Sequence, residues 1–165
     1  MIKSKKQIFK ISELNPAHYN PRKISDNELN GLTNSLNEFG YLQDIVVNIR
    51  DGKNVIVSGH QRLKVLDSDP SEEIECTVVD LDELREKALN VTMNNNAISG
   101  SYDAEMLEGI LQELHNDDDF KNFDELNFCD LVQEFGFNDV EIKEDNSKPA
   151  SSVKENECPK CKYKW

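Results

Sequence analysis

The sequence has 165 residues and carries 32 Asp and Glu against 19 Lys and Arg, a formal net charge of -13 at pH 7. This length suits one ordinary domain with a small appendage. No apolar run reaches the roughly 20 residues that a transmembrane helix needs, so we expect no membrane association. The basic start at Lys3–Lys6 lacks the apolar stretch of a secretory signal, and we expect a cytoplasmic protein.

Charge is distributed unevenly along the chain. Residues 1–66 hold 10 Lys and Arg against 6 Asp and Glu, net +4, whereas residues 67–147 hold 4 against 24, net -20. Residues 148–165 hold 5 against 2, net +3. Because phosphate contacts need cations, we expect the acidic stretch not to bind nucleic acid. An anionic ligand should meet residues 1–66 or the basic tail.

The chain opens with a predicted strand and the clearest predicted helix. Alternating apolar residues favour a strand at Gln7–Ile11, and two Asn-Pro steps make the following loop, residues 14–22, stiff. Ser25 and Glu28 have the spacing of a capping box, and leucines at helical spacing follow until Gly40. We therefore expect a helix between Ser25 and Gly40.

A hairpin and a short helix are predicted next. Strand patterns cover Leu42–Arg50 and Asn54–Ser58, and Asp51-Gly52 between them is a strong short-range hairpin signal. The second strand runs into the sequence GHQR, Gly59–Arg62, and a short amphipathic helix continues until Asp67. The GHQR segment therefore lies where a buried strand gives way to a helix.

This junction puts cations where a helix start favours acids. Arg62 and Lys64 fall in the first turn, where the macrodipole opposes positive charge. A phosphate bound at the free N–H groups of this turn would reverse that effect, because arginine then forms charge-assisted bonds to it. The alternative is a plain strand-to-helix connection with solvated side chains. Arg22 is a second candidate phosphate contact, with a surface ion pair as its alternative.

One strand and three helices complete the predicted elements. The patterns favour a strand at Ile74–Val79 and helices at about 82–94, 103–114 and 124–135. The inner face of the helix at 103–114 is expected to comprise Met106, Leu107, Ile110, Leu111 and Leu114. This order predicts an α+β fold, a small mixed sheet with helices, followed by acidic helices and a flexible tail.

The four cysteines divide into two kinds. Cys76 and Cys129 lie in apolar patterns and are expected to be buried hydrophobic residues. Cys158 and Cys161 have the spacing of half a zinc knuckle, and a structural zinc site needs four ligands. Zinc, if bound, should therefore be shared between two chains. The alternative is a reduced, disordered tail.

Several motifs in this order resemble a known family. Asn20-Pro21-Arg22, the leucine-patterned helix ending at Gly40, the LQxIVV pattern from Leu42 and the strand running into GHQR resemble the N-terminal domain shared by ParB-type partition proteins and sulfiredoxins. The resemblance covers roughly residues 7–100. It is nearest to the short ParB-like proteins of phages and mobile elements, which are often encoded near, or fused to, DNA methyltransferases.

The resemblance implies a nucleotide site. In the family the glycine-led box holds nucleoside triphosphate phosphates, of CTP in partition proteins and of ATP in sulfiredoxins, with Mg as a further candidate cofactor. The positions that match the family's nucleotide-binding residues are Arg22, Gln43, Gly59, His60, Gln61, Arg62 and Asn95.

Departures from the family pattern limit the chemistry. His60 or Gln61 stands where sulfiredoxins carry a reactive cysteine, so we do not expect sulfinic acid reduction. Met93 or Asn94 stands where partition proteins have a metal-holding glutamate, and Asp44 replaces a usual proline in the nucleotide pocket. We therefore expect a slow CTPase or ATPase at most.

The domain organisation expected from these observations has four parts. A nucleotide-binding domain at 1–100 is followed by an acidic helical extension at 101–142, a linker at 143–157 and half a zinc knuckle at 158–165. The acidic helices show no helix-turn-helix signal.

The function expected is nucleoside-triphosphate binding in phage or mobile-element DNA processing, meaning modification, segregation or regulation. Expected partners are a triphosphate, DNA directly or through another protein, a DNA methyltransferase and a second copy of the chain. One alternative is a small-molecule phosphotransferase or nuclease on the same fold. The other is a nucleotide-free adaptor for a DNA methyltransferase.

Overall fold

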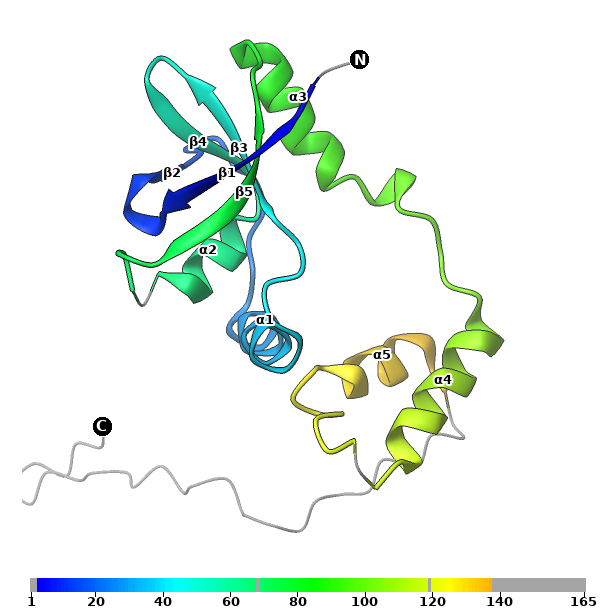
Figure 1. Ribbon diagram of the computed structural model, residues 1–165. Coiled ribbons are helices and arrows are strands. Elements are labelled where there is room, and N and C mark those ends of the chain that lie inside the picture. The colour runs from blue at the N-terminus through cyan, green and yellow to red at the C-terminus, as the bar shows by residue number, and fades with distance from the viewer. Residues whose placement is uncertain (1–2, 68, 119, 138–165) are drawn as a thin grey trace, which may run out of the picture.

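The computed structural model describes residues 3–67, 69–118 and 120–137 (Figure 1). A sheet with three helices forms the larger part, and two further helices pack together beside the first of these helices (Figure 1). The predicted linker at 143–157 and the Cys158 and Cys161 pair lie outside the described residues.

A single mixed sheet of five strands forms the centre of the fold, in the order β1-β5-β3-β4-β2. The β1–β5 and β3–β4 pairs are antiparallel, and the β3–β5 and β2–β4 pairs are parallel. This arrangement confirms the predicted α+β fold with a small mixed sheet. The strands are β1 (Lys5–Lys10), β2 (Leu14–Pro16), β3 (Ile45–Arg50), β4 (Lys53–Ser58) and β5 (Glu73–Val79).

The helices lie close to their predicted positions. None of those within the described residues combines the length and apolar character required to cross a bilayer. The helices are α1 (Asp26–Phe39), α2 (His60–Leu66), α3 (Glu83–Met93), α4 (Ala104–Asn116) and α5 (Phe128–Phe135), with short 3-10 turns η1 (Ile11–Glu13) and η2 (Asn96–Ile98).

Local sequence signals act as expected at α1 and in the hairpin. Glu28 Oε2 accepts the Ser25 N–H at 2.7 Å and Ser25 Oγ accepts the Glu28 N–H at 3.3 Å, which completes the capping box. Asp51 and Gly52 both have positive φ, 52° and 71°, as the tight turn between β3 and β4 requires. Gly40 ends α1 with a φ of 80°.

The main core lies on the sheet. Ile45, Val47, Ile56 and Cys76 are fully buried, and Phe9 is 5% exposed while its neighbour Ile8 is 62% exposed. Ile8 and Phe9 therefore lie on opposite faces of β1, as the alternation of the sequence predicts. Cys76 is the buried hydrophobic residue that the sequence indicates, and Cys129 is half-buried.

The start of β3 and the presence of β2 differ from the predictions. β3 begins at Ile45 rather than Leu42, and the Ile45 N–H donates to the Tyr41 hydroxyl at 2.6 Å. β2 forms where a loop was predicted. Because β2 is an edge strand, a proline such as Pro16 is tolerated there.

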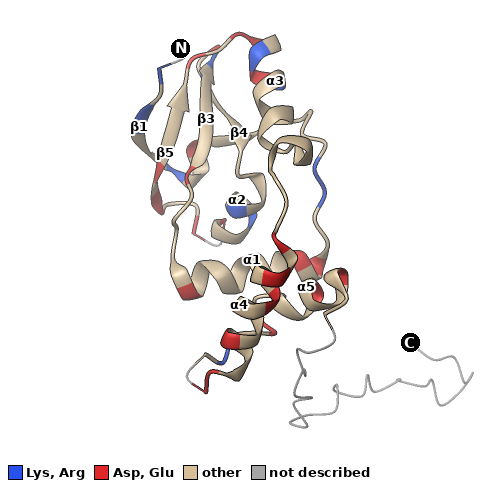
Figure 2. Ribbon diagram, turned by 90° about the vertical axis from the view of Figure 1, so that its right-hand side faces the viewer, with Lys and Arg blue, Asp and Glu red and all other residues tan. Residues whose placement is uncertain are grey.

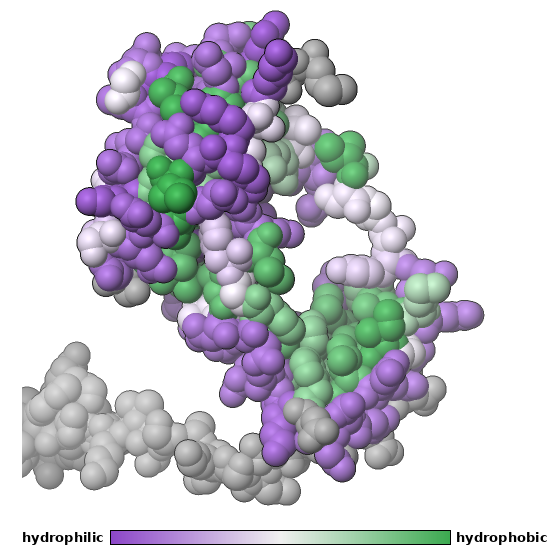
Figure 3. Space-filling model, viewed as in Figure 1, coloured by the Kyte–Doolittle hydropathy of each residue, from purple (hydrophilic) through white to green (hydrophobic). Residues whose placement is uncertain are grey.

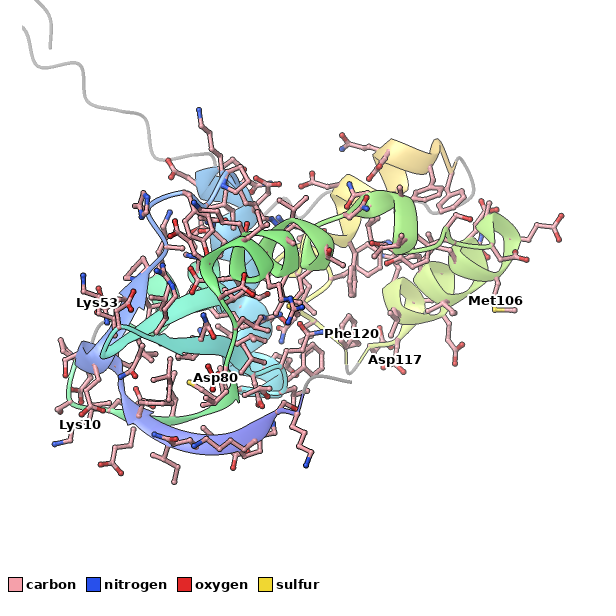
Figure 4. All side chains as sticks on the ribbon, turned by 90° about the horizontal axis from the view of Figure 1, so that it is seen from above. Lys10, Lys53, Asp80, Met106, Asp117 and Phe120 are labelled. Carbon is pink, nitrogen blue, oxygen red and sulfur yellow. The ribbon has the colours of Figure 1, made fainter. Side chains whose placement is uncertain are left out.

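A second core joins α4 and α5. Leu111, Phe123 and Val132 are its buried residues, and Figure 3 shows hydrophobic residues gathered over this part of the surface. The predicted inner face of α4 was partly wrong, because Met106 is 67% and Ile110 49% exposed. Figure 4 shows the Met106 side chain on the outer side of α4.

The helix α5 is shorter than predicted, and it packs with only part of the predicted inner face of α4. The helix predicted from residue 124 begins at Phe128, because residues 124–127 form turns and Asn127 adopts a positive φ of 61°. Leu107, Leu111 and Leu114 pack in the second core, whereas Met106 and Ile110 each precede a core leucine by one residue and so lie about 100° round the helix from it.

Polar contacts attach this pair of helices to α1. Asn34 Nδ2 donates to the Glu125 carbonyl at 2.8 Å, and Asn127 Nδ2 donates to the Asn27 carbonyl at 3.2 Å. Acidic residues mark α4, α5 and the ends of α1 (Figure 2). The helix α1 therefore lies between the sheet and the acidic pair α4 and α5 (Figure 1).

Candidate functional site

A cavity of about 830 Å³ lies between the sheet and α1. Its wall combines the loop before α1, the loop before β3, the β4–α2 junction and the C-terminal end of α3. The volume lies within the range of small-molecule sites, roughly 300–1,000 Å³. The charged residues that line it are Lys6, Arg22, Lys23, Glu28, Asp44 and Arg62.

Gly59 fixes the geometry of the β4–α2 junction. Its φ is 96°, a conformation that residues with a side chain rarely adopt. A Cβ built there would lie 2.9 Å from Ile45 Cγ1 and 3.2 Å from Ile45 Cα. Glycine at this position therefore lets α2 begin directly against β3, so that the GHQR segment borders the cavity.

The two predicted arginines lie on the same cavity, and no carboxylate among the described residues forms a salt bridge with either. Arg62 Nη2 donates to Gln43 Oε1, and Arg22 Nη1 donates to Asn94 Oδ1 at 3.0 Å. Burial lowers the pKa of Arg62; Tyr41 opposes this shift and the charge of Arg22 adds to it. Both guanidinium groups therefore face the cavity with neutral partners.

The carboxylates of the cavity are engaged elsewhere. Asp44 pairs with Lys6 and accepts a hydrogen bond from Thr77 Oγ1 at 2.7 Å. Glu28 belongs to the capping box, and hydrogen bonds from the backbone and side chain of Ser25 lower its pKa. The charge of Arg22 also lowers the pKa of Glu28, but the four Lys and Arg of the wall outnumber its two carboxylates, so the cavity keeps a net positive charge.

His60 lines the cavity and also ties two segments together. Its Nε2 accepts the Ala17 N–H at 3.1 Å, which fixes the loop after β2 to the start of α2. Burial lowers the pKa of His60, and the charge of Lys64 adds to this shift. The folded protein therefore favours the neutral His60 ring, whose Nε2 can accept this hydrogen bond.

The remaining predicted residues occupy different places. Gln61 lines the cavity, and its Oε1 is buried without a hydrogen-bond partner among the described residues. Asn95 lies outside the cavity wall and caps η2 by accepting the Ala97 N–H at 3.0 Å. Asn94 takes the place beside Arg22. The structure thus brings together six of the seven predicted nucleotide contacts.

No metal centre is evident in the part of the chain that the structure describes, where no group of three or more His, Cys, Asp or Glu side chains is placed to hold an ion. The engaged state of Glu28 and Asp44 agrees with this result. The predicted zinc ligands Cys158 and Cys161 lie beyond the described residues.

A second polar cluster, around Glu86, was not predicted. Glu86 is fully buried on α3 and accepts hydrogen bonds from Asn48 Nδ2 at 2.6 Å, the Tyr19 hydroxyl at 2.8 Å and Arg50 Nε at 3.3 Å. Burial alone would raise the pKa of Glu86, but these hydrogen bonds and the charge of Arg50 hold it below its usual value. In the sequence, Glu86 has the pattern of a solvated residue in an acidic helix.

Comparisons with known proteins point to one family. The family model described as the ParB N-terminal domain matches residues 3–97. A probable chromosome-partitioning protein ParB from Campylobacter jejuni is 36% identical over 90 residues, which cover 53% of this chain and 32% of that protein. The chain therefore spans about a third of the length of this curated relative.

One solved structure agrees in fold. A C-terminally truncated chromosome-partitioning protein ParB from Caulobacter crescentus, complexed with CTP-gamma-S, has a TM-score of 0.55 and 19% identity. That match covers 80% of this chain and 71% of the other. A pNOB8-like ParB N-domain has a TM-score of 0.47 and 19% identity, covering 70% and 43%.

Proposed function

The chain belongs to the ParB N-terminal domain family, and from this premise we propose that its cavity binds a nucleoside triphosphate. The observation that carries the proposal is a pair of arginines that form no salt bridge among the described residues and line a cavity of ligand size. A partly buried guanidinium with only neutral partners gains most from an anion that accepts two hydrogen bonds, and phosphate has that geometry. A triphosphate also supplies enough negative charge for both arginines.

The proposed contacts have different roles. Arg62 and Arg22 hold the phosphates, and Gln43 orients Arg62 through its hydrogen bond. Gly59 provides the close approach of α2 to β3, and Gln61 offers a buried acceptor to a donor group of the ligand.

The roles proposed for His60 and for the asparagines differ from those that the sequence implied. We propose that His60 acts mainly by fixing the Ala17 loop. In place of Asn95, whose side chain caps η2, we propose Asn94 as the α3 contribution to the site.

CTP is the first nucleotide to test, with ATP as the alternative. The Caulobacter crescentus protein of similar fold was solved with CTP-gamma-S. Mg, if it accompanies the nucleotide, would be held mainly by the phosphates, because Glu28 and Asp44 are engaged. The same engagement leaves neither as a free general base, and we propose that hydrolysis, if it occurs, is slow.

At the level of the cell, we propose a role in phage or mobile-element DNA processing, with segregation as the leading role because the Campylobacter jejuni relative is named for chromosome partitioning. The bound nucleotide would favour one arrangement of the acidic helices or of a dimer. DNA would be reached through the cationic residues 1–66 or through a partner such as a DNA methyltransferase.

Calorimetric titration of the full chain with CTP, ATP, GTP and UTP, each with Mg, tests the proposal. We expect one nucleotide to bind, and Arg22→Ala to weaken its binding by about tenfold, the loss of one charge-assisted bond. Arg85→Ala is the matched control, because Arg85 is an exposed arginine of α3 outside the cavity wall. If none of the four nucleotides binds, the proposal fails and the adaptor alternative stands; transfer of phosphate to, or cleavage of, DNA would instead favour the enzyme alternative.

A further inference from the structure

One face of α3 carries three polar side chains at a spacing of four residues, Glu86, Asn90 and Asn94. Residues four apart lie above one another on a helix, so these side chains form a row along its axis. Each of them meets a residue of the segment 19–22, which ends in Arg22. The row therefore runs from the Glu86 cluster to the cavity.

The first contact of the row fixes Tyr19. The Tyr19 hydroxyl donates to Glu86 Oε1 at 2.8 Å. The Lys87 ammonium, also on α3, lies 5.5 Å from the centre of the tyrosine ring, and the His18 ring packs against it edge-on at 5.4 Å. Both the hydroxyl and the ring of Tyr19 are thus held, in a position outside the cavity wall.

The second contact is made by a fully buried amide. Asn90 is 1% exposed, and its Nδ2 donates to the Val57 carbonyl at 2.7 Å while lying 3.5 Å from Asn20 Oδ1. Val57 is two residues before Gly59, so Asn90 connects α3 to the strand that leads into the GHQR segment as well as to the loop. These contacts satisfy the Asn90 amide nitrogen, whereas its Oδ1 is buried without a hydrogen-bond partner among the described residues.

The third contact reaches Arg22 itself. Asn94 Oδ1 accepts from Arg22 Nη1 at 3.0 Å, and Asn94 Nδ2 donates to the Asn90 carbonyl at 2.8 Å. The second bond fixes which way the Asn94 amide points, so its oxygen faces the arginine. Arg22 is exposed, and among the described residues Asn94 is the side chain that orients its guanidinium through a hydrogen bond.

We propose that Glu86, Asn90 and Asn94 are positioning residues that hold the Arg22 segment so that its guanidinium faces the cavity before the ligand arrives. The inference rests on the proposed nucleotide function. Arginine loses considerable side-chain freedom when it is fixed, and a preformed position removes that cost from the binding step. Loosening the row should therefore weaken binding even where every cavity residue is kept.

Tyr19→Phe in the full chain tests this inference, because it deletes only the hydroxyl at the end of the row far from the cavity. We expect CTP, or whichever nucleotide binds, to bind about three- to tenfold more weakly. We also expect hydrogen exchange of the backbone amides in residues 17–23 to become faster without nucleotide, while exchange in α1 and β3 stays unchanged. Thr92→Val is the matched control: it removes the Thr92 Oγ1 bond to the Ala88 carbonyl at 2.8 Å, elsewhere on α3.

The outcomes separate this inference from the function on which it rests. If the wild-type chain binds a nucleotide and Tyr19→Phe binds it equally well, the inference is overturned. Faster exchange throughout the chain would also overturn it, because the hydroxyl would then serve global stability. If the wild-type chain binds no nucleotide, the proposed function fails, and the exchange result alone decides whether the row holds residues 17–23.

Discussion

Arg50 and Arg62 differ in the charges that surround their guanidinium groups. Arg50, on β3, lies among Glu86, Glu83 and Asp51, and its hydrogen bonds to Glu86 raise its pKa. Arg62, at the start of α2, has Gln43 as its hydrogen-bond partner, and burial lowers its pKa. Arg50 thus has carboxylate partners within the protein, whereas Arg62 forms no salt bridge with a carboxylate among the described residues.

This difference predicts that substitutions in the Glu86 cluster affect mainly the stability of the fold, and that substitution of Arg62 affects mainly ligand binding. A buried ion pair keeps its favourable balance only while all its hydrogen bonds remain, so removing one member of the Glu86 cluster should unfold the protein more easily. A desolvated cation without a counter-ion contributes nothing comparable to folding. Its free energy falls when an anion binds, so its removal should affect the ligand rather than the fold.

The largest expected effect is on the Glu86 cluster. Glu86→Ala should lower the free energy of unfolding by about 3–5 kcal/mol, since three donors would lose their buried acceptor. Glu86→Gln, which keeps the shape, should lose less. Chemical denaturation at pH 7 measures both, and a Glu86→Ala protein as stable as the wild type would show that the cluster is not structural.

The same carboxylate predicts a pH dependence. The pKa of Glu86 is lower in the folded chain than its usual value, so its contribution to stability is complete at neutral pH and is lost as the pH falls through the folded-state pKa. The stability difference between the wild type and Glu86→Gln should therefore narrow on acidification.

A smaller loss is expected at the junction that places Arg62. Gly59→Ala should destabilise by about 2–4 kcal/mol, through a left-handed backbone that disfavours a side chain and a clash with Ile45. Gly136 is the matched control, because its φ is 67° but nothing lies within 4 Å of an added Cβ. Gly136→Ala should cost only about 1 kcal/mol. Equal losses in urea denaturation would show that the approach to Ile45 is not tight.

The smallest expected effect concerns His60. Its folded-state pKa is lowered, so the unfolded chain binds the proton more readily and stability should fall as the pH drops below the usual histidine value, about 6.5. Protonation also removes the acceptor for the Ala17 N–H. Unfolding free energies at pH 7.5, 6.5 and 5.5 should fall more steeply in the wild type than in His60→Gln. Parallel curves would exclude His60 as the titrating group.

Features encoded by neighbouring residues were predictable from the sequence. The capping box at Ser25, the turn at Asp51 and the alternation of β1 depend on spacings of a few residues, and each forms as expected. The cavity residues could be predicted in a different way. The GHQR segment and Arg22 belong to motifs whose order along the chain resembles that of a known family.

Features that depend on long-range packing were not predictable. Glu86 is buried only because Asn48, Arg50 and Tyr19 converge on it from 36 to 67 residues away in the chain. Likewise, the apolar pattern of α4 does not reveal which of its apolar residues the second core covers, and Met106 is exposed. Local patterns determine which residues could face a partner, and the way the partner packs determines which of them do.

The most direct test of the contrast between Arg50 and Arg62 is a paired measurement on Arg62→Ala and Arg50→Ala, with CTP titration and denaturant unfolding of each. Arg62→Ala should bind CTP about tenfold to a hundredfold more weakly, with unfolding unchanged or slightly improved. Arg50→Ala should unfold at a lower denaturant concentration than the wild type. Its folded form should keep an affinity for CTP closer to that of the wild type than Arg62→Ala does. The account is contradicted if Arg62→Ala destabilises the chain and its folded fraction still binds CTP normally, because Arg62 would then be a structural residue.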